Sequence, residues 1–156
     1  MLRLPFSFRV TLSTGNKSAA LSRRSRFLTA LVGAGLLGTL VLAGLLRPDP
    51  RGIGTHQQLG LPPCTLTVVA GIPCPACGMT TSWALVTKGR PLDALATHVT
   101  GTLLAVVALV AGMGATIVAV RGKRLAWQPG ETAAAIGALA LAGLVLFEWM
   151  FRLFAG

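Results

Sequence analysis

Three long apolar runs stand out against the polar positions of the chain: Phe27–Leu46, Val99–Val120 and Thr132–Phe151. Each has the roughly 20 apolar residues that a helix needs to cross the hydrocarbon core of a bilayer. In lipid, a single span can satisfy its backbone polar groups only as a helix. The pattern therefore predicts an all-α integral membrane protein with three transmembrane helices.

Composition and charge agree with this prediction. Of the 156 residues, 53% are hydrophobic and 12% are charged, and the net charge is +10. Nucleic-acid binders carry their cations along one face, whereas here the cations cluster between the apolar runs. We therefore expect the lipid bilayer as the main partner, and no nucleic acid.

The basic clusters predict the orientation of the spans. Residues 1–26 contain six Lys and Arg and no acid, and Arg121, Lys123 and Arg124 follow the second run. The positive-inside rule places both clusters in the cytoplasm. We expect a disordered cytoplasmic tail over 1–26 and a single membrane domain over 27–156 in a bacterial inner membrane, with residues 47–98 outside.

Small residues recur at helical spacing in all three runs. Such residues allow helix backbones to approach closely in lipid, so we expect a tight three-helix bundle. The residues concerned are Ala34 with Gly38, Ala108 with Gly112, and Ala134 with Ala138 and Ala142.

All three cysteines lie in the segment predicted to be outside. Cys64 precedes an apolar stretch of about two helical turns that ends at a glycine. In the following GIPCPACG, Cys74 suits an N-cap with Pro75 at the first helical position, which puts Cys77 in the first turn of a helix reaching Lys88. That helix is too short to span, so we expect it to be interfacial or re-entrant.

Polar residues also mark the ends of the second and third spans. Pro91 favours a helix start before the membrane, and we expect this helix to continue into the second span with a bend at Gly101. His98 fits a polar cap at the membrane interface. Glu148 lies four residues before Arg152, and this spacing favours a solvated ion pair near the outer interface.

The segment 60–112 resembles a family of small bacterial membrane proteins, domain of unknown function 2752. The family signature is a cysteine, then CPxCGxT about ten residues later, a short helix and a transmembrane helix. The chain departs at Thr81, where many members carry arginine. The resemblance implies an architecture, and the family has no established activity. The matching residues are Cys64, Gly71, Pro73, Cys74, Pro75, Cys77, Gly78, Thr80, Gly89 and Ala94.

Three functions remain open for the cysteine segment, and the structural one comes first. Buried cysteines usually behave as small apolar residues, so Cys74 and Cys77 would fill space or form one disulfide. Pro73 and Pro75 would shape the turn. Gly78 would permit close packing, and the hydroxyls of Thr80 and Thr81 would bond back to the helix.

The other two functions use the sulfur atoms chemically. In a thiol–disulfide protein, Cys74 and Cys77 would form the redox pair and Cys64 would resolve a mixed disulfide. In a metal site, Cys64, Cys74 and Cys77 would bind zinc with His98, or with His56, as the fourth ligand.

Neither a phosphate loop nor a nucleophile elbow is present in the sequence, and it has only four acids for acid–base chemistry. We therefore expect a non-enzymatic membrane component that works with a larger membrane-protein partner.

Overall fold

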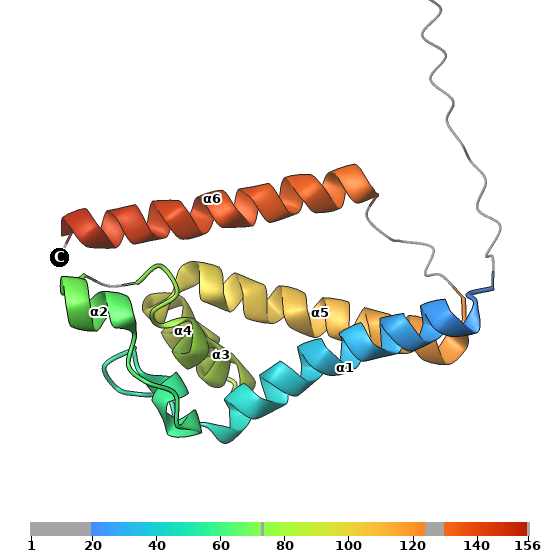
Figure 1. Cartoon of the computed structure of the whole chain (residues 1–156), viewed down its shortest axis with the longest axis horizontal. Helices are drawn as coiled ribbons and strands as arrows, with labels where there is room; N and C mark the ends of the chain where they lie inside the picture. The colour runs from blue at the N-terminus through green and yellow to red at the C-terminus, as the bar shows by residue number, and fades with distance from the viewer. Residues whose placement is uncertain (1–19, 73, 124–129, 156) are drawn as a thin grey trace, which may run out of the picture.

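The structure is a computed structural model, and it describes residues 20–72, 74–123 and 130–155 (Figure 1). The described residues form helices and one isolated bridge between Ala20 and Lys123, which confirms the all-α prediction. Most of the predicted tail, together with Pro73 and Arg124, lies outside the described residues. The helices are α1 (Arg23–Leu45), η1 (Thr55–Leu59), α2 (Thr65–Ala70), α3 (Met79–Thr87), α4 (Pro91–Thr97), α5 (Val99–Arg121) and α6 (Glu131–Ala155).

Three of these helices, α1, α5 and α6, are long and apolar enough to cross a membrane, as predicted. Helix α1 begins earlier than its apolar run, because Ser22 acts as its N-cap and accepts the Ser25 N–H at 3.2 Å. A serine at this position satisfies one of the free N–H groups of the first turn. Arg23, Arg24 and Arg26 are therefore helical, and the expected disordered tail does not extend to residue 26.

Helices α1 and α5 pack closely because glycines face each other. A β-carbon on Gly33 would lie 2.8 Å from the Thr116 hydroxyl and 3.2 Å from the Gly112 carbonyl oxygen. Further along, Leu40 packs with the buried Ala105 and Ala108. Close backbone approach through small residues is the usual way in which helices associate in lipid.

Hydrogen bonds also join α1 to α5 at the end of the helix pair that carries the basic residues. The guanidinium of Arg26 donates to the carbonyl oxygens of Ala119 and Val120 at 3.0 and 3.1 Å. Gly122, with φ of +66°, ends α5, and its carbonyl accepts the Leu21 N–H at 2.9 Å. A cation at the C-terminus of a helix also faces the negative end of its dipole.

Towards the other end, α1 and α5 diverge, α3 packs between them, and α4 packs against α3 and α5 (Figure 1). Trp83 and Val86 of α3 pack against the Leu40 cluster, with the indole nitrogen of Trp83 buried. This contact with residues inside two spans favours the re-entrant alternative for α3. Trp83 is half-buried in this contact.

The expected tight three-helix bundle is wrong in one respect: α6 stands apart from the α1–α5 pair (Figure 1). None of the span in α6 is buried within the described chain, and Ala134 and Ala138 are exposed. Of the predicted small-residue sets, only Ala108 with Gly112 lies at a helix contact. Gly33, one position before the predicted Ala34, provides the contact surface of α1.

A β-branched residue at Gly33 should separate α1 from α5. The new side chain would meet the Thr116 backbone nitrogen 3.1 Å from its β-carbon, and overpacking of this kind costs about 1–3 kcal/mol. Thermal unfolding in detergent should show a lower midpoint for Gly33→Val than for Gly38→Val, since a β-carbon at Gly38 meets nothing within 4 Å. Equal midpoints would contradict this packing.

Candidate functional site: a three-cysteine cluster on a polar anchor

The CPAC segment forms a tight turn that precedes α3. The Cys77 N–H donates to the Cys74 carbonyl at 2.9 Å, and the Met79 N–H donates to the Ala76 carbonyl at 3.1 Å. Gly78 then takes a φ of +98° and is the N-cap of α3. This left-handed conformation, which suits glycine, interrupts the helical path. Cys77 therefore lies in the turn, and the prediction that it belongs to the first turn of the helix was wrong.

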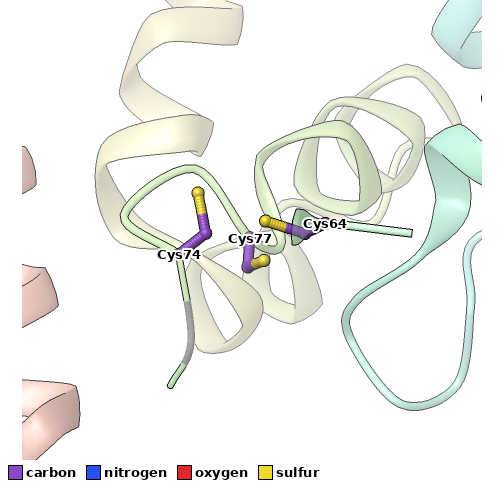
Figure 2. A group of neighbouring side chains, drawn as sticks. All are labelled: Cys64, Cys74 and Cys77. Carbon is purple, nitrogen blue, oxygen red and sulfur yellow. The ribbon is translucent and has the colours of Figure 1, made fainter. Parts of the chain in front are cut away.

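The turn and the start of α2 bring the three cysteines together. Cys64 is the N-cap residue of α2, and its side chain converges with those of Cys74 and Cys77 (Figure 2). All three sulfur atoms lie within 4.8 Å of one another. All three are free thiols and half-buried. The structure thus brings together the three cysteines that the sequence analysis grouped.

The surroundings give the thiols different acidities. The backbone N–H groups of Thr67 and Leu66 lower the pKa of Cys64 to about 7. Burial raises the pKa of Cys74, whose sulfur accepts the Ala76 N–H at 3.4 Å. Near neutral pH, Cys64 therefore becomes a thiolate more readily than Cys74.

A cavity of about 260 Å³ opens beside the sulfur atoms. Its wall comes from the loop before α2, from the CPAC turn and from the first turn of α3. The residues that line it are Gly54, Thr55, His56, Cys64, Cys74, Ala76, Cys77, Gly78, Thr80 and Thr81. His56 thus faces the same space as the cysteines, whereas His98 is absent from this wall.

Thr81 helps to hold this wall in place. Its side chain is buried, and its hydroxyl hydrogen-bonds to that of Thr55 at 2.8 Å. The Thr55 hydroxyl also accepts the Asp49 N–H at 3.1 Å. The hydroxyl of Thr81 therefore ties η1 to α3, a role different from the expected bond back to its own helix. Thr55 carries no sequence signal that would have singled it out.

His98 is the polar cap that its position predicted. It is 1% exposed and its extended backbone ends α4 and starts α5, so the expected continuous helix is interrupted at His98. Its Nδ1 accepts the Gly101 N–H at 3.1 Å, while its Nε2 lies 3.0 Å from the Pro75 carbonyl oxygen. A carbonyl oxygen only accepts, so Nε2 carries the proton. Both ring nitrogens are thus engaged away from the sulfur cluster.

Glu148 of α6 caps the same helix start. One carboxylate oxygen accepts the Val99 N–H at 3.0 Å, and the other accepts the N–H and hydroxyl of Thr100 at 2.9 and 2.7 Å. With His98, this carboxylate satisfies the first three N–H groups of α5. A negative charge at a helix N-terminus is also favoured by the dipole.

Arg152 completes the polar anchor, which we define as His98, Glu148 and Arg152. It forms the ion pair with Glu148 that the spacing predicted, at 2.6 Å. It also donates to the carbonyl oxygens of Cys77 at 3.0 Å and Thr97 at 2.7 Å. The pair is half-buried against the helix ends and bonded to backbone groups there, so it is less solvated than expected.

Removal of the Glu148 carboxylate should destabilise the protein strongly. Glu148→Ala removes the acceptor of two N–H groups of α5 and the carboxylate partner of Arg152, which keeps only its two carbonyl partners. Each hydrogen bond to a charged group contributes about 1.5–3 kcal/mol. Asp93→Ala is the matched control, since its ion pair with Arg90 is exposed and such pairs contribute about 0–1 kcal/mol. Unfolding in detergent by denaturant titration compares the two. Similar losses for both variants would contradict the anchor.

Alkylation of the metal-free protein should follow the different acidities of the thiols. Cys74→Ser with Cys77→Ser leaves only Cys64, whose rate with iodoacetamide should rise through a midpoint near pH 7, because the thiolate is the reacting form. The matched variant that keeps only Cys74 should reach its midpoint at higher pH. Coincident midpoints would rule out the backbone effect on Cys64.

Comparison with known protein families gives a match that covers the cysteine cluster. Residues 64–112 match the family model described as protein of unknown function (DUF2752), which confirms the resemblance. No curated protein and no solved structure matches the chain. The segment from Cys64 to Gly112 is therefore similar to this family, and it contains the three cysteines and His98 but neither Glu148 nor Arg152 of the polar anchor.

Proposed function

We propose that this protein is a small non-enzymatic component of a bacterial inner membrane that binds a thiophilic metal ion, zinc or copper(I), at Cys64, Cys74 and Cys77. The supporting observation is that all three sulfur atoms lie within 4.8 Å of one another. In a tetrahedral zinc site with Zn–S bonds of about 2.3 Å, neighbouring sulfurs are roughly 3.8 Å apart. Small side-chain shifts would therefore bring the three into bonding positions.

The participation of Cys64 places metal binding ahead of a purely structural role. A disulfide, or a turn in which cysteines act as small apolar residues, needs only Cys74 and Cys77, which both lie in the CPAC turn. Cys64 reaches the cluster from a different segment, at the start of α2. Three convergent sulfurs, beside an open cavity, are a ligand set that a soft metal ion prefers.

The proposed orientation places the cluster outside the cytoplasm. The described cations at the junction of α1 and α5, Arg23, Arg24, Arg26, Arg121 and Lys123, lie at the end of the helix pair opposite to the cysteines. The positive-inside rule supports a cytoplasmic N-terminus. The unburied span in α6 supports a larger membrane-protein partner beside it.

Metal analysis of the purified full-length protein tests this proposal. Protein expressed with zinc and extracted in detergent should retain close to one equivalent of metal per chain, and Cys64→Ser, Cys74→Ser and Cys77→Ser should each lower this content. Wild-type protein stripped by a chelator and then reloaded checks binding without relying on variant folding. Absence of metal in both preparations would refute the proposal.

Thiol–disulfide exchange is the second candidate, favoured by the position of a third thiol beside the CPAC pair. A cluster thiolate would attack a disulfide of an extracytoplasmic protein, forming a mixed disulfide and releasing one partner thiolate. A second cluster thiolate would then displace the other partner sulfur. The cluster loses two electrons and becomes a disulfide, and the partner gains them as two thiols.

Single-cysteine replacement separates this candidate from metal binding. If exchange occurs, one of the three Cys→Ser variants should accumulate a mixed disulfide with a second protein, visible on a non-reducing gel and lost on reduction. The variant that retains the attacking thiol but lacks the resolving one is the expected trap. Absence of any adduct in all three variants would exclude exchange.

A further inference from the structure

The cavity beside the cysteines contains a fourth side chain suited to a metal. Apart from the cysteines, its walls are glycine, alanine and threonine, with one exception. The exception is His56, whose imidazole nitrogens can bind a metal ion. We infer that His56 is the fourth ligand of a Cys₃His zinc site, an inference that rests on the proposed metal-binding function.

The segment that carries His56 is fixed beside the cluster. Thr55, the preceding residue, is fully buried and bonded to Thr81 of α3. Gly54 and Gly60 bracket η1 with positive φ angles of +93° and +77°. The helix that bears His56 is therefore anchored to the same helix that follows the CPAC turn.

The ring of His56 is free to bind, in contrast to that of His98. Within the described part of the chain, no hydrogen bond or ion pair is found for the His56 side chain, which is half-buried. The nitrogens of His56 do not belong to the group of three sulfur atoms that lie within 4.8 Å of one another. Rotation of the side chain towards the cavity must therefore accompany binding.

The ligand set favours zinc over copper(I). Three thiolates and one neutral imidazole form one of the common tetrahedral environments of structural zinc. Copper(I) is a soft ion that three thiolates alone can hold, so a nitrogen ligand adds less to its binding. In a Cys₃His zinc site the charges sum to −1, from three thiolates and the Zn²⁺ ion. A fourth ligand from η1 would therefore raise the affinity of the site for zinc more than its affinity for copper(I).

X-ray absorption and chelator competition on the zinc-loaded, full-length protein in detergent test this inference. Wild type should show three sulfur ligands and one nitrogen ligand. His56→Ala should lose the nitrogen, and its zinc affinity should fall at least about tenfold, since loss of even an outer-shell partner costs 10–100-fold. Copper(I) affinity should change much less.

Two matched variants serve as controls. Gln57→Ala changes the exposed neighbour of His56 in η1 and should keep wild-type zinc affinity. His98→Asn removes the other imidazole together with its bond to the Pro75 carbonyl, so zinc affinity can fall, but the bound zinc should retain its nitrogen ligand.

The outcomes separate this inference from the proposed function. If His56→Ala binds zinc like wild type, or if His98→Asn is the variant that loses the nitrogen ligand, the assignment of His56 is overturned and metal binding by the cysteines stands. If wild type binds no zinc and no copper(I), the proposed function itself fails.

Discussion

The carboxylate of Glu148 is the constraint on which the cysteine-bearing half of the structure depends. It lies 13% exposed among helix ends and accepts from the backbone of α5, from Thr100 and from Arg152. Helix termini leave N–H groups without intrahelical partners, and lipid offers no water to satisfy them. A charged acceptor from another span therefore stabilises both the helix start and the position of α6.

The same anchor positions the cysteine turn. His98 holds the Pro75 carbonyl and Arg152 holds the Cys77 carbonyl, so two backbone groups of the CPAC turn are fixed by side chains from the helix break and from α6. These two hydrogen bonds hold the backbone of the turn, while the sulfur atoms of Cys74 and Cys77 lie beside the cavity and close to that of Cys64. Because the anchor bonds only to the backbone of the turn, the thiols stay available for chemistry.

Different forces stabilise the basic end and the cysteine-bearing end of the molecule. Near the basic end, glycine contacts allow α1 and α5 to approach closely, and dispersion is the main attraction between helices in lipid. Near the cysteines, hydrogen bonds from the start of α5 to Glu148 connect α5 to α6, and Arg152 of α6 donates to the carbonyl oxygens of Cys77 and Thr97. Helix α6 has no comparable small-residue contact in the described chain, which explains why it stands apart over most of its length.

The sequence by itself determined the three spans, the cysteine set and the His98 cap, because hydropathy, cysteine spacing and a lone interfacial histidine are local signals. Only the tertiary structure decided which small residues meet, since Gly33 and Ala34 are equivalent in the sequence until a partner helix is placed. It also decided that Glu148 caps a helix about fifty residues away, and that His56, not His98, lines the cavity beside the cysteines. These choices depend on contacts between distant segments, for which a single sequence carries no local physical signal.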